Sequence, residues 1–232
     1  MSYRTTLLSR RKADLDLRAT KDAGAKRLLD PNSPVRRHYE DLADNLLSLG
    51  EGIKTVVVTS PEPGAGCTSA CIGLGAALAG MGHRAAVIDC NLENPQLHRM
   101  LGEPNFVGLT SGLKGNKTLE HYGHEAVPGL LVVPTGPIPS DSALLESRKF
   151  VDLVRGLQDR RDVVILDAPV AGRVLASPNL SGSFDGVLLV IHASRTSKST
   201  ARQTTDDLLG AGTNLLGVVL NGVISEYPGR RG

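Results

Sequence analysis

The sequence of 232 residues has no tryptophan, and its tyrosines and phenylalanines together make up only 3% of the chain. Proteins that bind single strands of nucleic acid stack the bases on aromatic side chains, so no nucleic-acid partner is expected. Only three cysteines occur, Cys67, Cys71 and Cys90, which are too few and too clustered for a disulfide framework. We therefore expect a protein of the reducing cytoplasm.

Long apolar runs are also absent. No stretch approaches the roughly 18 residues that a membrane-spanning helix needs, and residues 1–16 lack the apolar core of a secretory signal peptide. Hydrophobic residues make up 41% and charged residues 22%, which are ordinary values for a globular domain. The length fits one α/β domain with tails.

Charge is unevenly distributed along the chain. Residues 1–37 carry ten Lys and Arg against four Asp, whereas the remainder carries sixteen basic and twenty acidic residues. The segment Asp30–Pro34 contains two prolines and interrupts any helix. We predict a flexible basic arm over 1–33, a folded domain over 34–224 and a short tail over 225–232. The arm either contacts an anionic membrane surface or acidic partner, or is a solvated tail.

From residue 35 onward, β-branched runs alternate with helical patterns. This alternation is typical of a parallel sheet that is buried on both faces, so we predict a doubly wound, mostly parallel α/β sandwich. The expected strands are 54–59, 84–89, 130–135, 163–167, 186–191 and 215–220, and the expected longer helices are 68–81, 142–157 and 198–209.

A glycine-rich turn follows the first strand and reads SPEPGAGCTS over residues 60–69. A strand, such a turn and then a helix form the layout of a P-loop, in which backbone N–H groups bind phosphates. The motif has lysine directly after its second glycine, where this chain has Cys67. The next residue of the motif has a hydroxyl that reaches Mg²⁺, and here it is Thr68. The predicted nucleotide-binding residues are Gly64, Ala65, Gly66, Cys67, Thr68 and Ser69.

Two carboxylates follow later strands, as ligand-binding residues do in such sheets. Asp89 ends one strand, and Asp167 ends the run VVILD, which is similar to a Walker B strand. Asp167 could hold Mg²⁺ through its water shell, and Asp89 could act on the metal or on a proton. Each aspartate alone could instead cap a helix. Together with the glycine turn they predict an ATP or ADP site in which Asp89 and Asp167 are catalytic and Thr68, Asp89 and Asp167 bind Mg²⁺.

From about Pro34 to Val223 the chain resembles the cytoplasmic bacterial tyrosine kinases of polysaccharide export, the CpsD/CapB type, which belong to the MinD/ParA branch of P-loop proteins. The matching segments are TSPEPGAGCTS, AAVIDCNLENPQLHRMLG, NFVGLTSGLKG, LLVVPTGPIPSDSALLESRKFVDLV, DVVILDAPV and GVVLNGV. The resemblance implies a P-loop NTPase-like fold, a glycine loop that binds ATP, carboxylate motifs that handle Mg²⁺ and catalysis, and tyrosine as the substrate.

The chain departs from this family at four places. Cys67 stands at the position of the P-loop lysine, and Asp89-Cys90-Asn91 stands for the family's Asp-x-Asp. The tail offers one tyrosine, Tyr227, in place of a tyrosine cluster. The Glu-x-x-Arg-x-x-Arg oligomerisation segment aligns with residues 37–43, where the first two charges are reversed and the third is lost. The family's ring assembly is therefore in doubt here.

These departures leave the site more negative. At Cys67, Asp89, Asn91, Glu93 and Asp167 the net charge is −3 with a neutral thiol, against −1 in the family's pattern. Since lost charge-assisted hydrogen bonds cost about 1.5–3 kcal/mol each, we expect weak nucleotide binding and inefficient phosphoryl transfer. The resemblance then predicts a pseudokinase that regulates a membrane co-polymerase partner in exopolysaccharide or capsule export.

Three alternatives stay open. The first is an active ATPase or tyrosine kinase in which Arg84, Arg173 or Arg195 replaces the lysine. The second is a positioning factor of the ParA/MinD kind. The third is a redox pair or soft-metal site among the cysteines, since the start of a helix lowers the pKa of a thiol such as that of Cys67.

Overall fold

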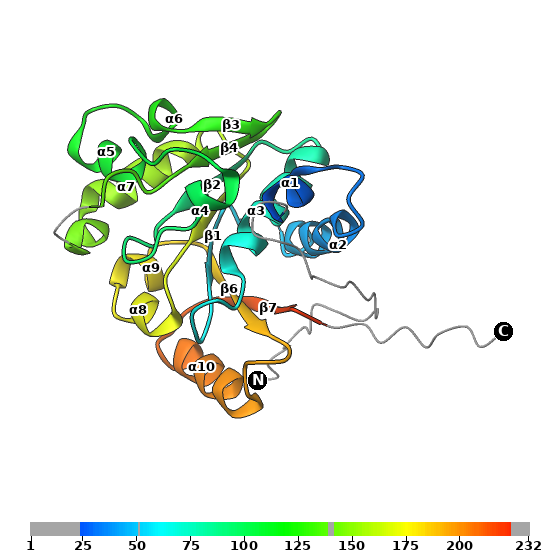
Figure 1. Cartoon of the computed structure of the whole chain (residues 1–232). Helices are drawn as coiled ribbons and strands as arrows, with labels where there is room; N and C mark the ends of the chain where they lie inside the picture. The colour runs from blue at the N-terminus through cyan, green and yellow to red at the C-terminus, as the bar shows by residue number, and fades with distance from the viewer. Residues whose placement is uncertain (1–23, 51, 139–141, 224–232) are drawn as a thin grey trace.

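A computed structural model describes residues 24–50, 52–138 and 142–223 (Figure 1). Seven strands form one sheet in the order β3-β4-β2-β5-β1-β6-β7. All neighbouring strands are parallel except β3 and β4, which confirms the predicted doubly wound, mostly parallel fold. The strands are β1 (Thr55–Thr59), β2 (Ala85–Asp89), β3 (His124–Val127), β4 (Leu130–Val133), β5 (Val163–Asp167), β6 (Gly186–His192) and β7 (Leu215–Asn221).

Helices connect the strands. Those predicted over 68–81 and 198–209 are confirmed as α3 and α10 within one residue at each end. The helices are α1 (Gly24–Leu29), α2 (Arg36–Leu47), α3 (Cys67–Gly80), α4 (Leu97–Leu101), α5 (Leu109–Lys114), α6 (Leu119–Tyr122), the 3₁₀ turn η1 (Ser142–Glu146), α7 (Arg148–Gln158), α8 (Ala171–Leu175), α9 (Pro178–Gly182) and α10 (Lys198–Gly210).

Two expected elements differ in the structure. The helix predicted over 142–157 is divided at Ser147, whose Oγ accepts a hydrogen bond from the backbone N–H of Phe150 at 3.2 Å. Ser147 thus caps α7 and separates it from η1. The predicted strand 130–135 ends at Val133, because Pro134 has no N–H to donate to a ladder.

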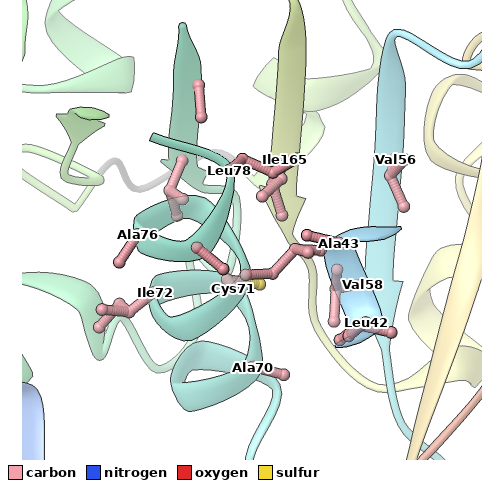
Figure 2. Packing of buried hydrophobic residues seen from close by; sticks show 14 of the residues in the cluster. Leu42, Ala43, Val56, Val58, Ala70, Cys71, Ile72, Ala76, Leu78 and Ile165 are labelled. Carbon is pink, nitrogen blue, oxygen red and sulfur yellow. The ribbon is translucent and has the colours of Figure 1, made fainter. Parts of the chain in front are cut away.

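The sheet lies between two helical layers. Val56 and Val58 point to one face and pack with residues of α2 and α3, whereas Val57 points to the opposite face and packs with residues of α7. Figure 1 shows α1, α2 and α3 on one side of the sheet and α7, α8 and α9 on the other. In Figure 2, the part of α2 that carries Leu42 and Ala43 lies beside α3 and next to Val58 of β1, and Cys71 lies among the apolar side chains of this layer.

Helix α2 packs on α3 through Arg36 and Tyr39, at and beside the segment 37–43 that the resemblance aligns with an oligomerisation motif. A Cβ on Gly73 would overlap the ring of Tyr39, and one on Gly80 would overlap the guanidinium of Arg36. The side chains of Tyr39 and Arg36 therefore pack where α3 has glycines and no side chain of its own. Burial raises the pKa of Tyr39 to about 12. This segment therefore contributes to the core of the described fold.

The folded part of the chain begins no later than Gly24, ahead of the predicted boundary at residue 34. Helix α1 lies within the range predicted as an arm, yet its Ala25 and Leu28 are buried. Residues 1–23 and 224–232, which include Tyr227, lie outside the described residues, so the contacts of the arm and the nature of the tail stay predictions. None of the described helices is long and apolar enough to cross a membrane.

Candidate nucleotide-binding site

The fold brings together the three sites that the sequence singles out. Strand β5 lies between β1 and β2, so the glycine loop after β1 and the two aspartates share one edge of the sheet. Asp89 and Asp167 are register partners, and Val58 pairs with Asp167 on the other side. This edge holds the carboxyl ends of the strands, where ligands bind in open α/β sheets.

The glycine loop has the backbone shape that a phosphate site needs. Gly64 and Gly66 have φ values of +77° and +101°, and α3 begins directly after them. No side chain caps α3, so the N–H groups of its first turn remain available to an anion. A Cβ on Gly66 would also overlap the amide of Asn221, whose Nδ2 donates to the carbonyl of Ala65 at 2.8 Å.

Thr68 and Asp167 form the part of the site suited to Mg²⁺. Thr68 Oγ1 donates to Asp167 Oδ2 at 2.6 Å, and Asp167 is 2% exposed. Burial raises the pKa of Asp167 well above its ordinary value, the charge of Asp89 raises it further, and hydrogen bonds from Thr68 and Cys71 oppose both effects. A hydroxyl beside a carboxylate supplies the oxygen ligands that Mg²⁺ prefers.

Asp89 is fully buried and holds the loop that follows it. Its Oδ1 accepts from the N–H of Asn91 at 3.1 Å, and its Oδ2 accepts from the N–H groups of Gln96 and Leu97 at 3.1 and 3.0 Å. Burial raises the pKa of Asp89 to about 6 in spite of these bonds. The carboxylate therefore has a structural role at the start of α4, and Oδ1 keeps a lone pair for a metal-bound water or a proton.

Cys67 is a neutral thiol. Burial raises its pKa to about 12, the charge of Asp167 adds to the rise, and a hydrogen bond with Ser60 opposes it. The expectation that the start of the helix lowers this pKa is wrong, because desolvation outweighs the hydrogen bonds that favour the thiolate. Nothing at the lysine position of the motif carries a positive charge.

The three cysteines give no support to a redox or soft-metal site. All three are free, and Cys71 and Cys90 are fully buried, which raises their pKa values. In residues 24–50, 52–138 and 142–223, no group of three or more His, Cys, Asp and Glu side chains is arranged to hold a metal ion. Buried protonated thiols behave as small apolar core groups.

The three arginines considered as replacements for the lysine lie in different places. Arg84 precedes β2 at the opposite edge of the sheet and pairs with Asp162, Nη2 to Oδ1, at 2.9 Å. Arg173 pairs with Glu93 at 2.7 Å, so it neutralises one of the negative charges in the net charge of −3 counted from the sequence. Arg195 contacts the glycine loop from the segment after β6, and its Nη2 donates to the carbonyl of Gly64.

Sequence reasoning missed two residues that hold this loop. Thr196, which follows β6, donates from Oγ1 to Glu62 Oε1 at 2.7 Å, and Asn221 ends β7 and binds Ala65. Strands β6 and β7 continue the sheet beyond β1. Their polar residues therefore reach the same edge as the glycine loop. For Asn221 the signal was a polar residue at the end of an apolar strand, the same signal that marks Asp89 and Asp167, whereas Thr196 lies in the loop beyond β6 and has no such signal.

No family model matches the chain, but comparison with curated proteins finds clear relatives. Tyrosine-protein kinase YwqD of Bacillus subtilis is 30% identical over 199 residues, which is 84% of each protein. The chain belongs to the bacterial tyrosine-protein kinase family. Tyrosine-protein kinase CpsD of Streptococcus pneumoniae serotype 4 is 29% identical and covers 85% of this chain and 88% of itself. EpsB of Ralstonia solanacearum is 31% identical over 226 residues, and the chain spans only 30% of its length.

Solved structures share this fold. The chimerical protein CapA2B2 has a TM-score of 0.80 and 26% identity over 88% of this chain and 91% of its own. The septum site-determining protein MinD of Pyrococcus horikoshii, in complex with Mg-ADP, has a TM-score of 0.60 and 21% identity over 75% of this chain and 74% of its own. The second likeness shows the P-loop NTPase-like fold alone.

The site fits a magnesium nucleotide in two respects and departs from it in a third. The uncapped turn of α3 offers backbone donors for phosphate, and Thr68 with Asp167 offers oxygen ligands for Mg²⁺. The kinase-family lysine position holds an uncharged thiol beside two buried carboxylates. The departure affects charge and leaves the backbone shape intact.

Proposed function

We propose that this chain is a pseudokinase of the bacterial tyrosine-protein kinase family, which binds nucleotide weakly and transfers phosphoryl groups inefficiently. The observation that supports this is the neutral, half-buried thiol of Cys67 at the first residue of α3. In phosphoryl transfer, charge moves onto the oxygens between donor and acceptor, and catalysis depends on cations placed there beforehand. Cys67 supplies none.

The remaining residues have distinct roles in this proposal. The N–H groups from Gly64 to Ser69 bind phosphate oxygens, and Thr68 and Asp167 hold Mg²⁺, which neutralises phosphate charge when it is bound. Asp89 fixes the loop before α4 and can accept one proton, since burial raises its pKa to about 6. These residues orient a nucleotide, but they do not replace the charge of the lysine.

The biological role follows from the family resemblance. We propose that the protein acts in exopolysaccharide or capsule export, on the cytoplasmic side of the membrane, as a regulator of a membrane co-polymerase. The basic residues 1–37 would then bring it near anionic lipid or an acidic partner. Co-purification with a co-polymerase from cells that produce the polymer tests this role, and its absence under conditions that preserve membrane complexes contradicts it.

Phosphotyrosine formation tests the enzymatic part. Purified wild-type protein, Cys67→Lys and the neutral control Cys67→Ser are each incubated with MgATP and a tyrosine-containing acceptor. We expect no phosphotyrosine with wild type or Cys67→Ser. Phosphotyrosine formed by wild type and lost in Asp89→Ala would overturn the proposal in favour of an active kinase.

A further inference from the structure

We propose that Arg195 supplies the positive charge for nucleotide phosphate that Cys67 does not supply. The inference rests on the proposed nucleotide site and adds to it a binding residue from a different loop. Arg195 lies between β6 and α10, 131 residues from Gly64 in the sequence, yet its guanidinium donates to the Gly64 carbonyl. The two nitrogens Nη1 and Nη2 lie 3.6 and 3.8 Å from where a Cβ of Gly64 would be.

Within the part of the chain that the structure describes, no carboxylate neutralises the charge of Arg195. Among the ion pairs of the described ranges, Arg84 and Arg173 each have an acidic partner and Arg195 has none. One of its five N–H donors is used on the Gly64 carbonyl. The remaining donors are available to phosphate oxygens, which a guanidinium binds with two parallel hydrogen bonds.

The loop that carries Arg195 is held against the glycine loop. Thr196 Oγ1 donates to Glu62 Oε1 at 2.7 Å and accepts from the N–H of His192 at 3.0 Å. The nearby carboxylate of Glu62 is therefore bound to Thr196. This arrangement fixes the backbone on both sides of Arg195 and leaves its exposed side chain free to turn toward a bound phosphate.

The position of Arg195 also explains why the protein would bind nucleotide and yet transfer phosphoryl groups inefficiently. Arg195 approaches from the Gly64 side of the loop, whereas the motif's lysine would extend from the first residue of α3. A cation on the outer side stabilises bound phosphate by charge. It does not reproduce the lysine's place beside the moving phosphoryl group, on which transfer depends.

Calorimetric titration with MgADP and MgATP tests the proposal. The proteins are wild type, Arg195→Gln, Arg195→Lys and Arg202→Gln, the last a matched loss of charge on the exposed face of α10. We expect Arg195→Gln to weaken binding by about tenfold or more, as loss of a charge-assisted contact does. Arg195→Lys should recover part of the affinity, and Arg202→Gln should leave it unchanged. Thermal unfolding of each variant verifies that it is folded.

A second comparison uses Cys67→Lys. With a lysine in the loop, Arg195→Gln should cost less than it does in wild type, which a double-mutant cycle measures. Equal affinity of wild type and Arg195→Gln overturns the proposal. So does a wild type that fails to bind while Cys67→Lys binds, and in that case the weak binding in the proposed function is also lost but its inefficient phosphoryl transfer stands. Phosphotyrosine formed by wild type would overturn the pseudokinase proposal but not the role of Arg195 in binding.

Discussion

Carboxylates where the strands of the sheet begin and where they end have pKa values that are shifted in opposite directions. At the edge where β2 and β5 begin, the exposed Asp162 binds both the N–H and the guanidinium of Arg84, at 2.7 and 2.9 Å, and these bonds lower its pKa. At the edge where the same strands end, Asp89 and Asp167 are buried side by side, and burial raises both pKa values.

This difference distinguishes a carboxylate that stabilises the fold, Asp162, from buried carboxylates that destabilise it and belong to a ligand site. A buried carboxylate without a cation costs free energy, so folding alone would favour a neutral residue at Asp167. Backbone donors compensate Asp89 in part, whereas the donors to Asp167 among the described residues are the hydroxyl of Thr68 and the thiol of Cys71. Titratable groups perturbed in this way gather at functional sites, which supports the assignment of this edge to ligand binding.

The largest loss of stability is expected for a substitution in the glycine loop, Gly66→Ala, compared with the same substitution in the turn before β2, Gly82→Ala. Gly66→Ala places a Cβ at φ +101° and against the amide of Asn221, so strain of about 1–3 kcal/mol adds to the loss of the hydrogen bond from this amide to Ala65, about 0.5–1.5 kcal/mol. Gly82→Ala, before β2, has φ +91° but no atom within 4 Å of the new Cβ, so only the strain applies. Urea denaturation measures both free energies of unfolding.

Equal losses in these two variants would contradict the comparison, because the overlap with Asn221 would then add nothing. Gly66→Ala combined with Asn221→Ala provides the control. Removing the amide should return part of the lost stability, until the cost of Gly66→Ala approaches that of Gly82→Ala.

The second effect concerns the pH dependence of stability. The pKa of Asp89 is about 6 in the fold against an ordinary 3.8, so the folded state holds more protons than the unfolded state between these values and stability falls as pH rises. Asp167→Asn removes one charge and its repulsion of the other. We expect it to raise the free energy of unfolding at pH 8 and to have little effect near pH 4, since the charge of Asp89 acts against an ionised Asp167.

Asp162→Asn is the matched change at the other edge and should have the opposite sign. Arg84 lowers the pKa of Asp162, so this carboxylate stabilises the fold above its ordinary pKa and loses that contribution as pH falls. Urea titrations from pH 4 to 8, with chelator and no nucleotide, give both profiles. If Asp167→Asn lowered stability at pH 8, the buried pair would not be under the repulsion inferred here.

The same contrast explains how far the sequence alone could predict this site. Continuous β-branched runs indicated the buried parallel strands, and Asp89, Asp167 and Gly66 could be placed together because parallel strands end at one edge. Two properties depend on contacts between distant segments. Burial by the whole domain sets the pKa of Cys67, and the choice of Arg195 required a contact across 131 residues.

The smallest effect is expected from Arg84→Gln. The pair with Asp162 is exposed, so solvent screens it and its loss should shift the urea midpoint by an amount close to the precision of the measurement. Salt sharpens the contrast, since the Debye length falls to roughly 3 Å at 1 M ionic strength. In 1 M NaCl the difference between wild type and Arg84→Gln should vanish, whereas the gain from Asp167→Asn should persist, because water and salt do not reach a carboxylate that is 2% exposed. A gain that disappeared in salt would place Asp167 in contact with solvent and remove the distinction between the two edges.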